Sequence, residues 1–245
     1  MRYGVFSDIH SNLEALESVL AAFKKEKIQS FLCLGDIVGY GPNPNECVQK
    51  LCGLKKIQFT AGSHDYAAVG MKEMTWFNNF ASRSLVWTKR RLREENRNFL
   101  MRLPRLVESS LFTMAHGSPR DPIDEYLLTA RQFLDNQEFF RTPICFIGHT
   151  HVPCVFYTDS LGVIQHKPLA QNEVFHFDSQ GKVIVNVGSV GQPRDGDNRA
   201  CGTLYDAEKH EIKMIRCAYD IQAVQTKMRQ MSLPLFLIER LSYGR

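Results

Sequence analysis

No segment of this 245-residue sequence is apolar for long enough to cross a lipid bilayer. A membrane-spanning helix needs about 20 consecutive apolar residues. The N-terminal MRYGVFSDIH also lacks the apolar core of a signal peptide. Linkers rich in Gly, Ser or Pro and internal repeats are missing as well. We therefore expect a cytoplasmic protein that forms a single domain over residues 1–245.

Paired cysteines of the CxxC type are absent. The chain has seven cysteines, an odd number, and several of them lie inside apolar runs such as FLCLGD and PICFIG. A thiol in such a run behaves as a small hydrophobic group. We therefore expect reduced cysteines, as in cytosolic proteins, rather than a disulfide framework.

The excess of positive charge is small, with 30 Lys+Arg against 26 Asp+Glu and a net charge of +4. Without a clustered basic face, this balance does not favour binding to duplex nucleic acid. In the dense charged stretch at 89–97, KRRLREENR, Arg90 and Arg91 stand four residues before Glu94 and Glu95. That spacing predicts salt bridges along one solvated helix face rather than a phosphate-binding patch.

Short apolar runs alternate with helical patterns over residues 1–62. RYGVFS, SFLCLGD and IQFTAG are typical of strands, whereas NLEALESVLAAFKKEK and PNECVQKLCGL are typical of helices. Ser11 or Asn12 can cap the first helix. The order β-α-β-α-β predicts parallel strands joined by crossover helices.

The rest of the chain mixes helices and strands. The pattern is mostly helical over residues 66–102, and apolar runs such as PICFIGHTH and VPCVFYTD then predict further strands. VFHFDSQGKVIVNVGS and TLYDAEKHEIKMIRCAY each resemble two strands around a polar turn, so this half is expected to be antiparallel or mixed and to give two sheets in all. The tail is helical with a break at Pro234. Its apolar stretch from Pro234 to Leu241 is expected to pack on its own sheet, with a dimer surface as the alternative.

Acidic and histidine side chains follow the apolar strands where these run into Gly-containing loops. In chain order they are Asp8, His10, Asp36, His64, Asp65, His116, His149 and His151. In open α/β sheets, ligands bind at this edge. Residues two apart in an extended segment project the same way, so Asp8 with His10 would direct two ligand atoms to one point. The same holds for His149 with His151.

Mixed imidazole and carboxylate ligands suit Zn, Fe or Mn, and a shared Asp36 could bridge two ions. A single Asp after a strand is more often a cap or turn residue, and a single His is more often a hydrogen-bonded loop residue. Capping does not readily explain five separate strand ends that carry ligand-type residues in order. The pattern therefore favours a binuclear metal site.

These motifs resemble the signature of the calcineurin-like metallophosphoesterases, which is D-x-H, G-D, G-N-H-[DE], a His and G-H-x-H, in that order. The corresponding residues here are Asp8-Ile9-His10, Gly35-Asp36, Gly62-Ser63-His64-Asp65, His116 and Gly148-His149-Thr150-His151. The strings SDIHSNLEAL, GDIVGYGPNPNECV and NVGSVGQPRDGD are similar, more narrowly, to a bacterial subgroup of diadenosine tetraphosphate hydrolases and general phosphodiesterases.

The resemblance implies an α/β fold, a four-layer α-β-β-α sandwich of two mixed sheets flanked by helices, with two divalent transition-metal ions (Mn, Fe, Zn or Ni) at the sheet edges. Asp8, His10 and His151 would hold the first ion. Asp36 would bridge both ions, and His116 and His149 would hold the second. The remaining second-site ligand is an Asn in the signature and Ser63 here, a shorter and weaker donor. The second ion would then bind through a water, bind loosely or be missing.

The activity implied is hydrolysis of a phosphodiester, phosphoanhydride or phosphomonoester by attack of a metal-bound hydroxide. His64 would protonate the leaving oxygen or stabilise the transition state, with Asp65 orienting or charging its imidazole. A supporting role is the alternative for His64. The expected partner is a small phosphorylated molecule such as a nucleotide or dinucleoside polyphosphate, with no membrane partner. Two other classes stay open: a binding scaffold without catalysis, favoured by Ser63, and a protein Ser/Thr phosphatase.

Binding of phosphate needs donors beyond the metals. The loop GSVGQPRDGDNRA supplies Arg194 and Arg199, whose planar guanidinium groups suit phosphate oxygens. Pairing of Arg194 with Asp195 or Asp197 in a turn is an equally good structural explanation. Asn12 is either a substrate contact or the cap of the first helix, and the cap is favoured.

Overall fold

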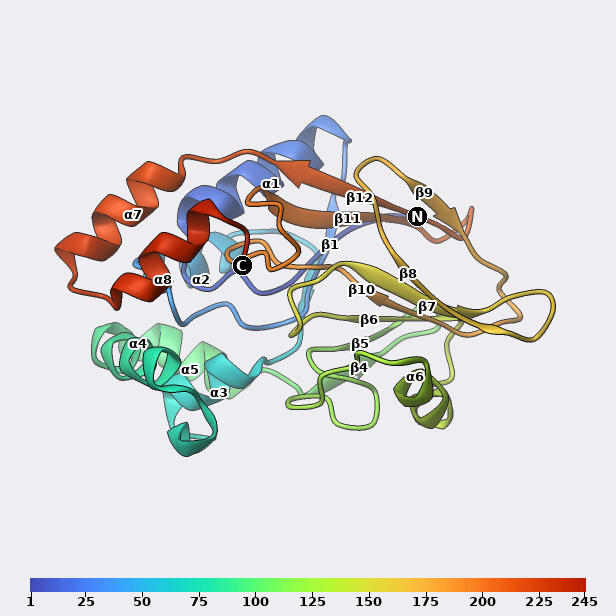
Figure 1. Cartoon of the computed structure of the whole chain (residues 1–245), viewed down its shortest axis with the longest axis horizontal. Coiled ribbons are helices and arrows are strands. Elements are labelled where there is room, and N and C mark those ends of the chain that lie inside the picture. The colour runs from blue at the N-terminus through green and yellow to red at the C-terminus, as the bar shows by residue number, and fades with distance from the viewer.

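The computed structural model describes residues 1–245 as two six-stranded mixed sheets packed face to face, with helices on the outside (Figure 1). The expected α/β sandwich is confirmed. The model has no helix that combines the length and the apolar character needed to span a membrane.

The first sheet has the strand order β3-β2-β1-β11-β12-β9. Its strands are β1 (Arg2–Phe6), β2 (Ser30–Cys33), β3 (Ile57–Phe59), β9 (Val174–His176), β11 (Ala200–Asp206) and β12 (Glu211–Cys217). The parallel pairing of β1, β2 and β3 confirms the β-α-β-α-β prediction, and the hairpin of β11 and β12 confirms the predicted strand pair there.

The second sheet has the order β4-β5-β6-β10-β7-β8. Its strands are β4 (Leu106–Glu108), β5 (Thr113–Ala115), β6 (Ile144–Ile147), β7 (Cys154–Thr158), β8 (Ile164–Pro168) and β10 (Val183–Asn186). The predicted hairpin within VFHFDSQGKVIVNVGS is wrong, because β9 pairs with β12 in the first sheet and β10 lies between β6 and β7 in the second. Val183, Ile184 and Val185 are all buried, as expected of a central strand covered on both faces.

The main core lies between the two sheets and follows the alternation of strand side chains. Val5 belongs to the cluster shared with the second sheet, whereas its neighbour Phe6 packs in the cluster under the helices. Gly4 lets the first helix approach closely, because a Cβ atom there would lie 2.8 Å from the Phe23 ring. The helix and the first sheet are therefore in direct contact.

Helices flank the outer faces of the sheets and gather at one end of the sandwich (Figure 1). They are α1 (Leu13–Lys25), α2 (Pro44–Cys52), α3 (Ser63–Val69), α4 (Asn79–Arg91), α5 (Glu94–Met101), α6 (Ala130–Asn136), α7 (Ile221–Gln230) and α8 (Leu235–Glu239), with 3-10 turns at η1 (Met74–Trp76), η2 (Gln137–Phe139) and η3 (Arg240–Ser242). In α1 the buried residues Ala15, Leu16, Val19 and Phe23 form the single apolar face that the sequence pattern predicts.

Two expectations about the helical regions differ from the structure. The charged stretch at 89–97 is not one helix, because α4 ends at Arg91 and Leu92 and Arg93 have extended backbone before α5 begins. Arg90 and Arg91 therefore do not share a helix face with the glutamates of α5. The tail does not lie on a sheet: Leu237 of α8 packs with α7, Ala81 of α4 and Tyr40, beside the strand-end loops.

Candidate metal centre

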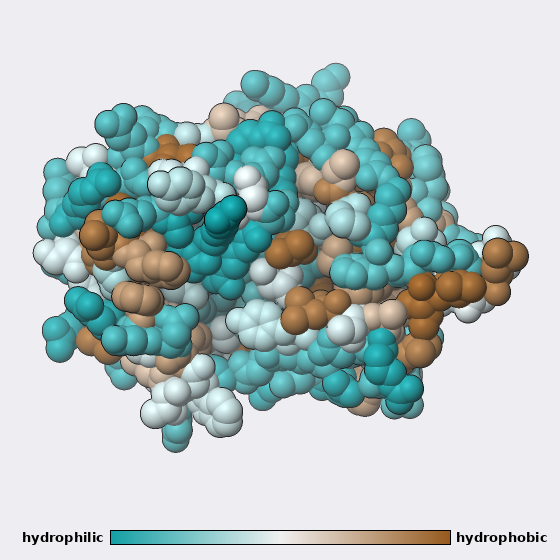
Figure 2. Space-filling view, viewed as in Figure 1, coloured by the Kyte–Doolittle hydropathy of each residue, from teal (hydrophilic) through white to brown (hydrophobic).

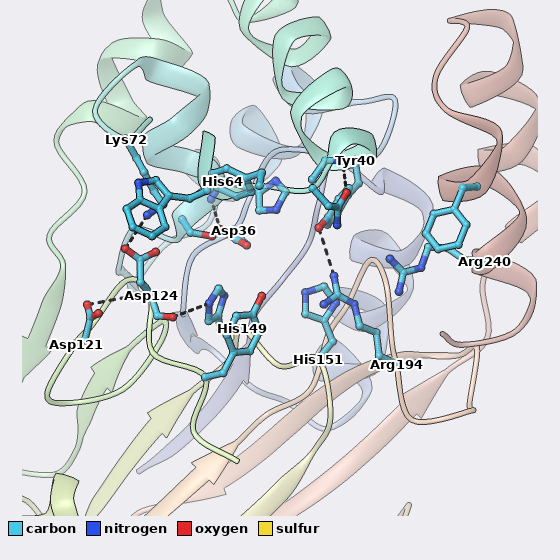
Figure 3. Close-up of a pocket in the computed structure, with 17 residues that line it drawn as sticks. Asp36, Tyr40, His64, Lys72, Asp121, Asp124, His149, His151, Arg194 and Arg240 are labelled. Atoms are coloured by element: carbon cyan, nitrogen blue, oxygen red, sulfur yellow. Dashed lines mark hydrogen bonds and ion pairs between the residues drawn. The ribbon is translucent and has the colours of Figure 1, made fainter. Parts of the chain in front are cut away.

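The strand-end residues predicted from the sequence converge at one edge of the sandwich. The loops after β1, β2 and β3 of the first sheet meet those after β5, β6 and β10 of the second. Figure 3 shows Asp36, His64, His149 and His151 around one cavity at this edge. Three groups have ligand atoms within 4.8 Å of one another: Asp8, His10 and His151; His10, Asp36 and His64; and Asp36, His116 and His149. All seven are buried.

The first group is built on Asp8. Its Oδ1 atom lies 3.2 Å from Nε2 of His151 and 3.7 Å from Nε2 of His10, and these two ring nitrogens are 3.2 Å apart. Oδ2 of Asp8 accepts a hydrogen bond from the backbone N–H of His149, 3.0 Å away. The carboxylate is therefore held by the second sheet while its other oxygen faces two imidazoles.

The second group is built on Asp36, which lies between the two halves of the cluster. Its Oδ2 atom is 3.3 Å from Nε2 of His116 and 3.6 Å from Nε2 of His10. Oδ1 accepts from the backbone N–H of His64 at 2.8 Å. Nε2 of His116 is also 3.0 Å from Nδ1 of His149, so these two rings face each other as His10 and His151 do.

Backbone carbonyls orient the four imidazoles. Three rings direct Nδ1 at a carbonyl oxygen: His10 at that of Val38 (3.3 Å), His116 at that of Leu34 (2.9 Å) and His151 at that of Gln192 (2.5 Å). His149 instead directs Nε2 at the carbonyl oxygen of Asp124, 3.3 Å away. A carbonyl oxygen only accepts, so each ring donates a proton outwards and turns its other nitrogen into the cluster. Ring orientation of this kind is typical of metal ligands.

The turns that carry the ligands are left-handed, not extended. Asp8 and His10 have φ of 55° and 48°, Asp36 has 49°, and His149 and His151 have 66° and 63°. The expectation that Asp8 with His10, and His149 with His151, project together from extended backbone is therefore wrong. Non-glycine residues rarely adopt this conformation, and they cluster at functional sites.

The carboxyl groups of the cluster are ionised. Burial favours the neutral form, yet the imidazoles of His151 and His116 bring the pKa of Asp8 well below its usual value. For Asp36, burial likewise opposes ionisation, and the neighbouring His116 and His64 lower the pKa far below the usual range. The site thus presents two buried negative charges within one ring of imidazoles.

The imidazoles of the cluster differ in pKa. Burial alone would lower the pKa of His116, but Asp36 and Asp8 raise it to about 9. Burial and the neighbouring His116 lower the pKa of His149 to about 3. Burial and Arg194 lower the pKa of His151 to about 4. In the absence of a cation, one proton therefore occupies the space between two ring nitrogens.

In the G-S-H-D motif, Ser63 and His64 line the cavity, whereas Asp65 bonds to backbone N–H groups. Ser63 begins α3, is buried and lines the cavity together with Asp36. Nδ1 of His64 has no hydrogen-bond partner, and burial lowers the pKa of this imidazole well below its usual value. Asp65 does not contact that ring: its carboxylate accepts from the backbone N–H groups of Gly62 at 3.0 Å and Val38 at 3.1 Å. Burial and Asp36 raise its pKa to about 7.

The three predicted substrate contacts lie in different places. Arg194 lines the cavity and donates to Oε1 of Gln192 at 3.0 Å, whereas Asp195 pairs with Arg216 instead. Arg199 is held away from the cavity by an ion pair with Asp197 at 2.6 Å.

Asn12 caps α1. Its Oδ1 atom accepts from the N–H of Ala15 at 3.1 Å, and its side-chain amide donates to Gly191 at 3.0 Å. Both ends of the side chain are therefore in use, so the structure supports the cap rather than the substrate contact.

The cavity in front of the cluster has a volume of about 860 Å³, within the range of small-molecule sites. Aromatic and basic side chains that the sequence patterns did not single out line it: Tyr40, Lys72, Trp76, Phe77, Tyr126, Phe236 and Arg240. Tyr126 stacks on His149 with ring centroids 3.9 Å apart. Tyr40 contacts the rings of His10 at 4.5 Å and His64 at 4.4 Å. No local motif marks these residues, because they reach the site from separate loops and helices.

The donor set fits divalent transition-metal ions. Oδ1 of Asp8 is fully buried and has no hydrogen-bond partner. An unsatisfied buried polar atom costs about 1–3 kcal/mol, more if charged. The facing ring nitrogens of His10 and His151 have no donor between them. A cation at this point would satisfy all three atoms, and imidazole with carboxylate is a combination that Mn, Fe, Zn and Ni accept.

The chain is similar to known proteins in sequence and in fold. The model of the calcineurin-like phosphoesterase superfamily domain matches residues 1–210. An uncharacterized protein of Methanocaldococcus jannaschii is 38% identical over 98% of this chain and 97% of its own length. A metallophosphoesterase structure from Sphaerobacter thermophilus superposes with a TM-score of 0.90 and 39% identity, covering 100% of this chain and 99% of that one.

The fold extends to more distant relatives. The structure of a hypothetical protein from Pyrococcus horikoshii has a TM-score of 0.82 at 20% identity, covering 100% of this chain and 98% of that chain. From the domain match and the near relatives, the chain belongs to the calcineurin-like phosphoesterase superfamily.

Proposed function

We propose that the protein is a metal-dependent phosphoesterase that hydrolyses a phosphodiester, phosphoanhydride or phosphomonoester of a small molecule in the cytoplasm. The observation that carries this proposal is the position of Asp36 between two groups of buried ligands, one containing His10 and the other His116. A single shared carboxylate between two sets of imidazoles suits two divalent ions.

Each ion has its own ligands in this proposal. Asp8, His10 and His151 would hold the first ion, and His116 and His149 with Ser63 the second, with Asp36 shared. Bound ions of this kind lower the pKa of water from 15.7 to roughly 7 and neutralise charge on phosphoryl oxygens. The protein contributes left-handed turns at five of these residues and carbonyl contacts that orient the four imidazoles.

His64 is the proposed proton donor or transition-state contact. Its ring lies 4.4 Å from Tyr40 and 4.9 Å from Phe77, measured between centroids, and lines the cavity beside the cluster. A neutral imidazole with one N–H can donate a hydrogen bond to the leaving oxygen. Asp65 acts through the backbone, because its carboxylate ties the start of α3 to the loop after β2.

A nucleotide is the proposed substrate. Three partly exposed aromatic rings line the cavity: Trp76, Tyr126 and Phe236. Flat apolar side chains of this kind can stack on a base. Arg194 lies in the same cavity, where its guanidinium can contact phosphate oxygens.

The test is hydrolysis by metal-stripped and metal-reloaded protein. Purified chain treated with a chelator should be inactive towards bis(p-nitrophenyl) phosphate and regain activity with Mn²⁺. Asp36→Asn should lower kcat by at least 100-fold, whereas His176→Ala on the exposed face of β9 should retain activity. No turnover of any phosphodiester or phosphomonoester with Mn²⁺, Fe²⁺, Zn²⁺ or Ni²⁺ would contradict the proposal and favour a binding scaffold. Faster turnover of a phosphopeptide than of diadenosine tetraphosphate would favour a protein phosphatase.

A further inference from the structure

Residues beyond the matched superfamily domain help to form the wall of the cavity. The domain match ends at residue 210, yet Phe236 of α8 and Arg240 of η3 line the cavity with His151 and Arg194. The apolar side of α8 fixes this arrangement, because Leu237 and the residues around it are buried against α7 and Tyr40. In Figure 2, apolar side chains of this region border a strongly hydrophilic central area.

Arg194 and Arg240 approach each other, and neither pairs with an Asp or Glu side chain. Neither guanidinium has a carboxylate oxygen of Asp or Glu within 4.0 Å, although Arg199 and Arg216 of the same region are both paired with acids. Figure 3 shows the two guanidinium groups turned towards one another beside His151, below Tyr40.

The existing hydrogen bonds leave donors free in both groups. Arg194 uses Nη2 for Gln192 at 3.0 Å and for the hydroxyl of Tyr40 at 3.4 Å, while its Nε atom is buried with no partner. Arg240 uses Nε for the oxygen of Arg245, the last residue of the sequence, whose terminal carboxylate carries a negative charge; the Nη atoms of Arg240 make no hydrogen bond. Because a guanidinium has five N–H donors, each group keeps donors for a ligand.

Two positive charges in a partly buried wall repel each other, and Arg194 has no ion-pair partner. Burial and the neighbouring Arg194 lower the pKa of Arg240 to about 10, as expected of a cation beside another cation. On the opposite wall, Lys72 already pairs with Asp124 at 2.7 Å, so that side offers no competing free cation. An anion held between the two arginines would remove the repulsion and gain hydrogen bonds from planar groups suited to phosphate.

We propose that Arg194 and Arg240 together bind a second phosphate group of the substrate, separate from the phosphoryl group that reacts at the metal centre. The preferred substrate is therefore a nucleotide ester with two phosphate groups, and Arg240 is a residue that determines specificity. This inference rests on the proposed function for the first phosphoryl group.

The experiment compares two esters that differ by one phosphate: thymidine 5'-(p-nitrophenyl phosphate) and its 3'-phosphorylated form. The Mn²⁺-loaded protein should prefer the 3'-phosphorylated ester by at least tenfold in kcat/KM, mainly through KM. Arg240→Gln should reduce that preference to less than threefold, and Arg240→Lys should retain part of it because the charge remains. Arg229→Gln, on the exposed side of α7, should keep the full preference.

Two results would overturn the inference: no preference in the unmodified protein, or the same preference in Arg240→Gln as in Arg229→Gln. Failure of the proposed function is a different result, because neither ester would then be hydrolysed. In that case, calorimetry measures the binding of thymidine 3',5'-bisphosphate to the metal-loaded protein and so tests the second phosphate site directly. Binding at least fivefold weaker in Arg240→Gln than in Arg229→Gln supports the second phosphate site, and equal binding refutes it. Equal unfolding midpoints of the two variants show that the fold is intact.

Discussion

The Nε2 atoms of His10 and His151 lie 3.2 Å apart, and both rings direct their Nδ1 atoms at backbone carbonyls. Carbonyl oxygens accept the Nδ1 protons, so two lone pairs face each other in a buried space. Oδ1 of Asp8, 3.2 Å from His151, adds a negative charge to the same point. Such an arrangement is unfavourable without a proton or a metal ion between the three atoms, because unpaired buried polar groups cost free energy.

The protein should therefore be more stable with a divalent metal ion than without it. At a Mn²⁺ concentration 100 times the dissociation constant, binding to the folded chain alone adds about 2.7 kcal/mol to the free energy of unfolding. His151→Ala removes one ligand and should lose most of this gain. Thermal unfolding with a chelator and with Mn²⁺ measures the effect. If Mn²⁺ stabilised His151→Ala as much as the exposed His176→Ala variant, the ion would bind elsewhere.

Replacement of Ser63 tests the weakest of the proposed ligands. Ser63 lines the cavity with Asp36, and a serine hydroxyl is shorter and a weaker donor than an amide oxygen. Ser63→Asn should tighten binding of the second ion, raise the metal content of dialysed protein towards two ions per chain and leave turnover unchanged or raised. Elemental analysis after dialysis provides the measurement, with Ser63→Ala as the matched variant that has no donor. Identical metal content in both variants and the unmodified protein would show that position 63 is not a ligand.

Asn12 should act on stability rather than on substrate binding. Asn12→Ala loses the cap of α1 and the bond to Gly191, so the free energy of unfolding should fall by about 2 kcal/mol, roughly half from each contact. Asn12→Asp keeps the cap oxygen but not the amide donor, and should lose about 1 kcal/mol. Urea unfolding gives these values, and KM should change less than twofold. A large rise in KM at unchanged stability would instead support a substrate contact.

The strand-helix order and the candidate ligands could be predicted from the sequence because both depend on local patterns. Parallel strands are continuous apolar runs, and Asp36 and His116 stand where such runs end. The strands that pair with β9 and with β10 could not be predicted in this way. Each segment has strand character, and only packing over the whole chain assigns Val174–His176 to one sheet and Val183–Asn186 to the other.

Positions of side chains around the ligands depended on non-local contacts. Asp65 stands next to His64 in sequence, yet the start of α3 turns its carboxylate to the N–H groups of Gly62 and Val38. Arg240 lies 46 positions after Arg194 by number and meets it only because α8 folds back over Tyr40. No spacing rule in the sequence links such residues, so the wall of the cavity was beyond prediction from motifs.

Glu125 gives the loop between β5 and α6 a pH-dependent stability. Its side chain is only 10% exposed and accepts hydrogen bonds from Ser118, from Arg120 and from Asn136, the last at 3.1 Å. Burial would raise its pKa, but the hydrogen bonds from Ser118, Arg120 and Asn136 lower the pKa below its usual value. The charged form therefore stabilises the folded state.

The sign of the effect follows from this lowered pKa. The contribution of Glu125 is fully present above the ordinary pKa of 4.5 and is lost as the pH falls through the lower value of the folded state. At pH 7, Glu125→Gln should lower the free energy of unfolding by about 1–3 kcal/mol, because a neutral amide replaces a carboxylate among three donors. The difference between the variant and the unmodified protein should shrink steadily below pH 4.5, as chemical denaturation at a series of pH values can measure. The exposed Glu138→Gln variant serves as the control, and a Glu125→Gln penalty that stayed constant down to pH 3 would mean that the carboxylate charge contributes nothing.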